Sequence, residues 1–164
     1  MQPSRISSKG ARQVAERVAQ QLAADPRVRL VYLFGSAADS ERATVRDVDV
    51  AVLTAPPISA DELLRLRADL VLATGAEVDL VSLNNAPVVL AWEVAESGHC
   101  LYARDADAET EFVTGARSRY WDFKPFLDEQ WRLSGARLQE RQRGTSTPTR
   151  YQRRLTSRSA PRTG

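Results

Sequence analysis

The residues best suited to chemistry are a Gly-Ser pair and two aspartates in one short stretch of the chain. Gly35 and Ser36 are followed, after ten residues, by Asp47 and Asp49. Gly-Ser at the end of a strand allows a sharp turn and leaves backbone N–H groups available to an anion. Unpaired carboxylates on a buried strand cost free energy, and a divalent cation removes that cost. We therefore expect an anion-binding turn that faces a metal-binding pair of aspartates.

Two apolar segments must position these residues. Val28–Phe34 leads into the Gly-Ser turn, and Val48–Leu53 contains the second aspartate. Each segment has the length and the apolar, partly β-branched composition of a buried strand. Because side chains alternate along a strand, Asp47 and Asp49 point to one face and the valines between and after them to the other. Residues 37–46 form a polar connector, in which we expect a short helical turn.

Helices and strands alternate around this pair of strands. Apolar periodicity predicts helices over residues 11–24, 60–74, 86–97 and 108–140, and strands over residues 77–83 and 99–103. Ser59 and Glu62 have the spacing of a capping box, and Gly75 is placed to end the second helix. That helix is predicted to bury Leu63, Leu64, Leu66, Leu70 and Val71. The order predicts an α/β (α+β) fold, with a small mixed sheet flanked by helices and a long C-terminal helix.

A third carboxylate follows on the strand predicted over residues 77–83. Glu77 and Asp79 share one face of that strand because they are two residues apart. Either carboxylate could complete an acidic site, by binding a metal or by taking a proton from an attacking hydroxyl. The residues alone leave both candidates open.

Length and composition exclude several classes of protein. The 164 residues suffice for one domain with a core, and 43% hydrophobic with 27% charged residues is typical of a soluble globular protein. No apolar run approaches the roughly eighteen residues of a membrane span, and the N-terminus lacks an apolar signal segment, so a cytoplasmic protein is expected. Cys100 and His99 are single, which excludes an internal disulfide and a Cys- or His-based metal cluster, and we interpret both as structural.

Charge divides the chain into an acidic body and a basic tail. The first 140 residues carry 16 basic and 21 acidic side chains, whereas seven arginines and no acids follow Glu140. We predict a folded domain over residues 1–141 and a disordered, arginine-rich tail over residues 142–164. Nucleic acid is expected as a partner only through this tail, and an extension without a role is the preferred interpretation.

The last predicted helix carries an aromatic and aliphatic stripe. Its residues recur at spacings of three, four or seven: Phe112, Ala116, Tyr120, Phe123, Leu127, Trp131 and Leu138. The preferred interpretation is that the stripe packs on the sheet. The alternative is that part of it is exposed to a partner, because aromatic residues are favoured at interfaces.

The motif resembles that of the nucleotidyltransferase superfamily, and specifically the minimal nucleotidyltransferases (MNT). Gly35-Ser36, ten residues and Asp47-Val48-Asp49 form the pattern GSx10DxD. The resemblance continues through Val78–Asn84, Gly98–Tyr102 and the aromatic last helix, so it covers residues 11–138. It implies the nucleotidyltransferase fold and a magnesium-dependent enzyme that transfers a nucleotidyl group from ATP to a hydroxyl.

The resemblance also implies roles for individual residues. Asp47, Asp49 and Asp79 would hold two Mg²⁺ ions, and Asp79 is preferred to Glu77 because it lies in the Val-Asp-Leu run that the family shows. Gly35 and Ser36 would hold the triphosphate.

The connector departs from the family pattern. Many members have a small residue, arginine and glycine just after Gly-Ser, whereas this chain has Ala37, Ala38 and the acidic Asp39 there. Arg42 or Arg46 is the candidate for the missing cation.

MNT antitoxins of HEPN–MNT pairs are expected to transfer AMP to a tyrosine of a HEPN ribonuclease toxin. The resemblance therefore implies an antitoxin with a HEPN partner, and it leaves a hetero-oligomer open. Two alternatives are a small-molecule nucleotidyltransferase of the aminoglycoside or lincosamide type and a non-catalytic, toxin-binding antitoxin. The chain is not itself expected to be the toxin, because HEPN toxins carry an arginine, then four to six residues, then a histidine. The corresponding positions before His99 hold Trp92, Glu93 and Val94.

Overall fold

The computed structural model describes residues 5–39, 41 and 44–144 of the chain, with side-chain surroundings as far as residue 136. The described chain divides into two compact units, the first ending at Asp122 and the second beginning at Phe123. Most of the tail predicted over residues 142–164 lies outside the described residues, so its predicted disorder stays a prediction.

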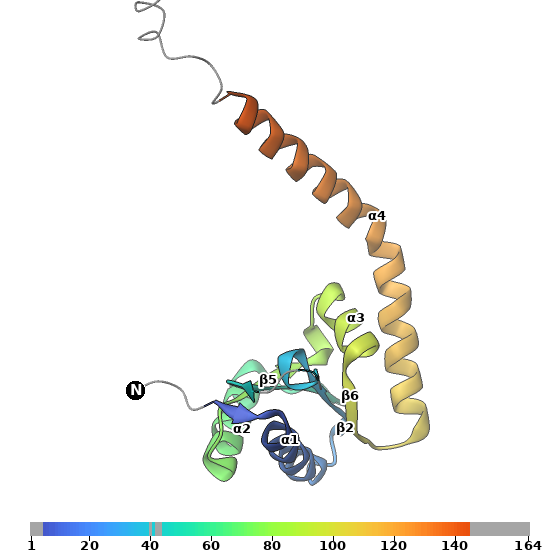
Figure 1. Ribbon diagram of the computed structural model, residues 1–164. Helices are drawn as coiled ribbons and strands as arrows, with labels where there is room; N and C mark the ends of the chain where they lie inside the picture. The colour runs from blue at the N-terminus through green and yellow to red at the C-terminus, as the bar shows by residue number, and fades with distance from the viewer. Residues whose placement is uncertain (1–4, 40, 42–43, 145–164) are drawn as a thin grey trace, which may run out of the picture. The chain divides into compact units, whose positions relative to one another are not determined.

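A four-stranded mixed sheet forms the centre of the first unit (Figure 1). Its strands are β2 (Val28–Phe34), β4 (Val48–Thr54), β5 (Val78–Ser82) and β6 (His99–Ala103), in the order β5-β4-β2-β6. β2 is antiparallel to both β4 and β6, whereas β4 and β5 are parallel. The prediction of a small mixed sheet is therefore confirmed.

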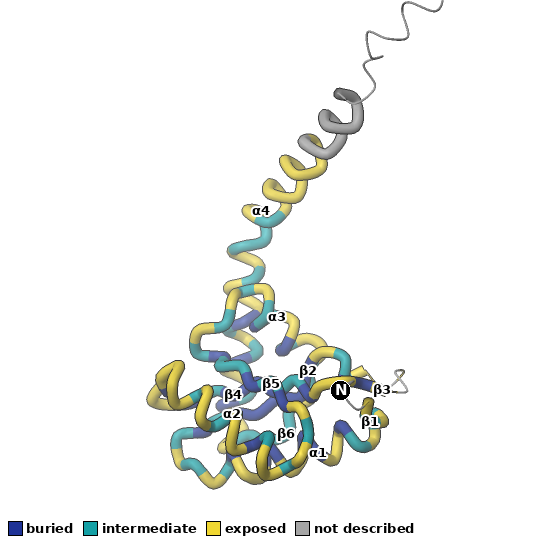
Figure 2. The backbone as a smooth tube through the Cα atoms, turned by 90° about the vertical axis from the view of Figure 1, so that its left-hand side faces the viewer, coloured by how far each residue is buried: buried dark blue, intermediate teal, exposed yellow. Residues whose placement is uncertain are grey.

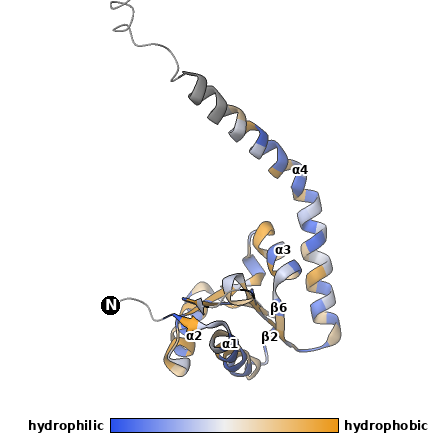
Figure 3. Ribbon diagram, in the orientation of Figure 1, coloured by the Kyte–Doolittle hydropathy of each residue, from blue (hydrophilic) through white to orange (hydrophobic). Residues whose placement is uncertain are grey.

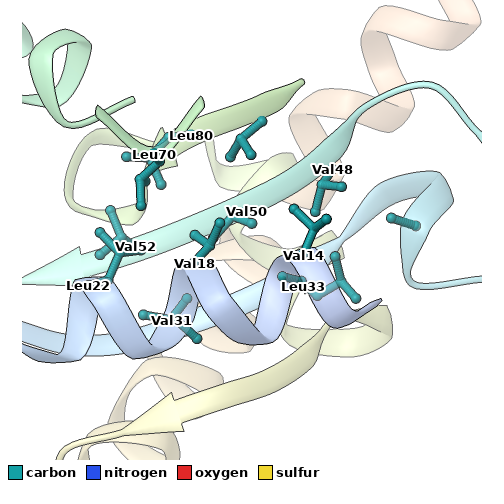
Figure 4. Packing of buried hydrophobic residues seen from close by; sticks show 14 of the residues in the cluster. Val14, Val18, Leu22, Val31, Leu33, Val48, Val50, Val52, Leu70 and Leu80 are labelled. Carbon is teal, nitrogen blue, oxygen red and sulfur yellow. The ribbon is translucent and has the colours of Figure 1, made fainter. Parts of the chain in front are cut away.

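Helices cover both faces of this sheet. α1 (Ser8–Ala23) and α2 (Ala60–Thr74) pack on one face, and α3 (Val88–Ser97) and the first turns of α4 (Ala106–Gly144) pack on the other. Each face has its own apolar cluster, and the buried segments in Figure 2 are mainly the strands and the inner faces of these helices. Figure 4 shows the first cluster, which includes Val14, Val18 and Leu22 of α1 against Val31, Leu33, Val50 and Val52 of the sheet.

Helix α2 begins and ends as predicted. The Ser59 hydroxyl accepts a hydrogen bond from the Glu62 N–H, and the Glu62 carboxylate accepts one from the Ser59 N–H. Gly75 ends the helix in the left-handed conformation. The prediction that Leu64 is buried is wrong, because Leu64 is 62% exposed. Leu64 follows Leu63 by one residue, which is about 100° around a helix and turns it away from the narrow buried stripe.

A second, two-stranded sheet was not expected from the sequence. β1 (Ile6–Ser7) pairs antiparallel with β3 (Thr44–Val45), so the connector contains a short strand. A 3₁₀ turn, η1 (Gly35–Ala37), forms at the Gly-Ser pair and reaches only the first residue of the connector, where the helical turn was predicted, and a second one, η2 (Leu83–Asn85), follows β5. The sheet ties the end of the connector to the start of α1.

One part of the aromatic stripe of α4 packs on the sheet, as the preferred interpretation predicts, and another part is exposed, as the alternative predicts. In the first unit, Phe112 and Ala116 are buried against the sheet, and the ring of Tyr120 stacks on that of Trp92 with centroids 4.2 Å apart. In the second unit, the stripe residues Phe123 and Leu127 are half-buried and Trp131 is 75% exposed, whereas Leu138 lies beyond the described side chains. Figure 3 shows polar and apolar residues alternating along this helix. Among the described residues, no helix combines the length and apolar character needed to cross a membrane.

Candidate functional site

The candidate site lies where one end of β2, β4 and β5 meets the turn η1. The antiparallel register pairs Phe34, at the end of β2, with Asp49 on β4. The parallel register pairs Asp49 with Asp79 on β5. Asp49 therefore stands between the Gly-Ser turn on one side and Asp79 on the other. Because their neighbours Val48, Val50, Val78 and Leu80 belong to the apolar cluster under α1 and α2, both aspartates face the side of α3.

Gly35 brings the turn directly against Asp49. Its φ of +64° is in the left-handed region, and a Cβ at this position would run into the Asp49 carboxylate. Ala38 closes the turn by donating its N–H to the Gly35 carbonyl at 3.2 Å. Ser36 is half-buried within the turn. A glycine is required here both for the backbone conformation and for the space that the carboxylate occupies.

Asp49 is surrounded by other negative charge. Partial burial, together with the nearby carboxylates of Asp47, Asp79 and Glu93, raises its pKa to about 6. Glu93, on α3, was missed by sequence reasoning, because an exposed glutamate on a helix carries no signal of its distance from a strand. A raised pKa at a carboxyl that lies among other carboxylates is typical of a functional site.

Asp79 is held by an arginine that the sequence did not single out. Nη1 of Arg67, on α2, lies 3.5 Å from Oδ1 of Asp79, and its Nε donates to the Val78 carbonyl at 3.0 Å. Glu77 is exposed and precedes β5, and its carbonyl accepts a hydrogen bond from the Val48 N–H. The register opposite Asp49 thus favours Asp79 over Glu77 as the third carboxylate.

A cavity of about 270 Å³ opens beside these carboxylates. Its lining contains two arginines, three acidic residues and one valine: Arg46, Asp47, Arg67, Glu77, Val78 and Asp79. The structure therefore brings Arg46 to the site, and it adds Arg67 as a second cation. Arg42, the other candidate for a phosphate contact, lies outside the described residues.

The carboxylates of the site suit a magnesium ion that is also bound by the phosphates of a nucleotide. Carboxylate oxygens are the hard ligands that Mg²⁺ prefers. Within the described ranges, however, no three His, Cys, Asp or Glu side chains are grouped closely enough to hold a metal by themselves. Magnesium is commonly bound through one or two carboxylates together with substrate phosphates, and an incomplete carboxylate set of this kind is consistent with that arrangement.

Comparisons with known proteins show which family the chain resembles. The profile of the family described as "Polymerase beta, Nucleotidyltransferase" matches residues 16–107. The protein adenylyltransferase MntA of Shewanella oneidensis is 34% identical over 84 residues, which span 51% of this chain and 60% of that protein.

Solved structures resemble the chain over more of its length. A chain in the crystal structure of a toxin–antitoxin with AMP-PNP has a TM-score of 0.61 and 29% identity, covering 71% of this chain and 98% of that one. For the toxin–antitoxin MntA-HepT, the TM-score is 0.58 and the identity 27%, covering 73% and 98%.

Proposed function

The chain belongs to the polymerase beta nucleotidyltransferase family, and on that premise we propose that it is an antitoxin that transfers AMP from ATP to a tyrosine hydroxyl of a HEPN ribonuclease toxin. The observation that carries the proposal is the placement of Asp49 between the Gly35 turn and Asp79. The similarity to an adenylyltransferase and to chains of toxin–antitoxin structures, one of them with AMP-PNP, supports the choice of nucleotide and partner. Use of ATP and of a ribonuclease partner would place the reaction in the cytoplasm.

In the proposed reaction, the tyrosine oxygen forms a bond to the α-phosphorus of ATP as the bond to pyrophosphate breaks. Gly35 and Ser36 hold the triphosphate through backbone N–H groups and the Ser36 hydroxyl. Asp47, Asp49 and Asp79 provide the carboxylates for two Mg²⁺ ions, which when bound neutralise phosphate charge and orient the reacting oxygens. Such transfers depend on positioning and charge neutralisation more than on covalent help from the protein.

The proton of the tyrosine hydroxyl needs an acceptor at the moment of attack. Asp79 is the proposed acceptor if it does not bind a metal, because it is the carboxylate on the far side of Asp49 from the phosphate-binding turn. Arg46, at the end of the connector, and Arg67, on α2, line the adjacent cavity and supply positive charge beside the carboxylates.

A transfer assay tests this proposal. The full chain is incubated with labelled ATP, Mg²⁺ and the co-encoded HEPN protein, beside the variant Asp47→Asn/Asp49→Asn. The exposed pair Asp69→Asn/Asp122→Asn is the matched control for loss of two carboxylates. We expect label on the toxin with wild type and control, and at least a hundredfold less with the site variant. No label with wild type, or equal label with the site variant, would refute the proposal.

Neutralisation by contact alone is the second candidate function. The exposed Phe126 and Trp131 on α4 favour it, because exposed aromatic residues are typical of protein interfaces. If the Asp47→Asn/Asp49→Asn variant still protects cells from the toxin, contact and not transfer is the mechanism.

A further inference from the structure

We propose that His99 is a positioning residue, which fastens the turn η1 so that its N–H groups are set to receive the triphosphate of a nucleotide. The inference rests on the proposed function, because it assigns a role within the same site. Sequence reasoning had treated this histidine as structural only.

The position of His99 follows from the sheet. It is the first residue of β6, and the antiparallel register pairs it with Leu33, two residues before Gly35. β6 is the edge strand opposite β5, so the site is approached by His99 from one edge and by Asp79 from the other. A residue at this register position can reach the turn that follows β2.

The contact itself is a single directed hydrogen bond. Nε2 of His99 lies 3.0 Å from the carbonyl oxygen of Ala38, the residue after η1. A carbonyl can only accept, so Nε2 must carry the hydrogen, which both the protonated ring and one neutral tautomer allow. The residue is exposed and is not part of either apolar cluster, so its removal takes little from the core.

The hydrogen bond from His99 joins the turn to β6, whereas a second hydrogen bond lies within the turn itself. The Ala38 N–H donates to the Gly35 carbonyl, and the Ala38 carbonyl accepts from His99. Beyond the turn, the chain continues through the acidic Asp39 and Glu41, which repel a triphosphate. A turn that is already ordered before the nucleotide binds avoids an entropic cost of binding. The role of His99 is therefore in nucleotide affinity and not in bond-making.

Nucleotide binding by the full chain tests the inference. The probe is AMP-PNP with Mg²⁺, measured by calorimetry for wild type, His99→Ala and His99→Gln. Losing one hydrogen bond is expected to weaken binding by about two- to tenfold in His99→Ala. Glutamine places an amide donor close to the position of Nε2, so His99→Gln is expected within about twofold of wild type. Gln20→Ala, exposed on α1, is the surface control, and thermal unfolding verifies that all variants fold.

The transfer assay over a range of ATP concentrations up to saturation supplies the second readout. His99→Ala is expected to keep the wild-type kcat and to raise KM for ATP, which a general loss of structure would not do. The inference is overturned if His99→Ala binds AMP-PNP as tightly as wild type, if His99→Gln is as weak as His99→Ala, or if kcat falls with affinity unchanged. A wild type that binds AMP-PNP without transferring AMP would refute the proposed function alone and leave the role of His99 measurable.

Discussion

Replacing Gly35 by alanine examines whether the close approach of the turn to Asp49 assembles the site. Gly35 has a φ of +64°, and the Asp49 carboxylate occupies the space in which a Cβ of this residue would lie. Gly75, which ends α2, has nearly the same φ of +67°, but nothing lies within 4 Å of the position of a Cβ there. The two substitutions therefore share the backbone cost and differ in the contact with Asp49.

The expected magnitudes follow from this difference. A left-handed residue other than glycine costs about 1–2 kcal/mol, so both variants should lose about that much free energy of unfolding and remain folded. In Gly35→Ala, the methyl group must also displace either the turn or the Asp49 carboxylate. Because a misplacement of about 1 Å can cost about a hundredfold in rate, we expect transfer to fall by about that factor in Gly35→Ala and by less than about twofold in Gly75→Ala.

Urea unfolding measures the stability of both variants, and transfer from labelled ATP to the HEPN protein measures their activity. A further loss of stability in Gly35→Ala beyond that of Gly75→Ala would report the repulsion between the methyl group and the carboxylate. If both variants lose the same stability and transfer AMP equally well, the packing of Gly35 against Asp49 has no functional role, and the reasoning is refuted.

Two further predictions concern the acidic side of the site. The pKa of Asp49, about 6, lies above the 3.8 of an unperturbed aspartate, so the folded chain binds this proton more tightly than the unfolded chain. Its contribution to stability is present below about pH 4 and is lost as the pH rises to about 6, and urea unfolding in EDTA should show that Asp49→Asn removes this part of the pH dependence. Arg67→Met should lower transfer by about tenfold at nearly unchanged melting temperature, because it releases the carboxylate of Asp79, whereas Arg65→Met on the exposed face of α2 should not. Equal activity of the two arginine variants would exclude a positioning role for Arg67.

The sheet was predictable because its strands are long enough to show a pattern. β2, β4, β5 and β6 have five to seven residues each, and their apolar runs and turn residues are local signals. β1 and β3 have two residues each, and a pairing such as Ile6 with Val45 is set by distant parts of the chain. Leu64 was assigned to the core as a neighbour of the periodic apolar residues of its helix, but helix geometry places it outside the stripe that α2 presents to the sheet.

For the candidate site, the sequence predicts which carboxylates lie on the same face of a strand, but not which of them meet across the sheet. Alternation alone places Asp47 and Asp49 on one face, but it places Glu77 and Asp79 on one face equally well. The choice between those two depends on the parallel register, which pairs Asp79 with Asp49 and is not written in either strand alone. Arg67 could not be found from the sequence, because it reaches the strand from a helix on the opposite face of the sheet.

The parallel register of β4 and β5 also limits where residues can be inserted or deleted without loss of the site. One residue inserted in β4 ahead of Asp49 would turn that carboxylate to the opposite face of the sheet, because side chains alternate with a period of two. Among the residues of the connector (37–46) that the structure describes, only Thr44 and Val45 pair in a sheet, so its length is far less constrained. Insertions and deletions among descendants of this gene should therefore gather in the connector. A search for distant relatives should keep the aspartate spacing fixed and let the ten-residue gap vary.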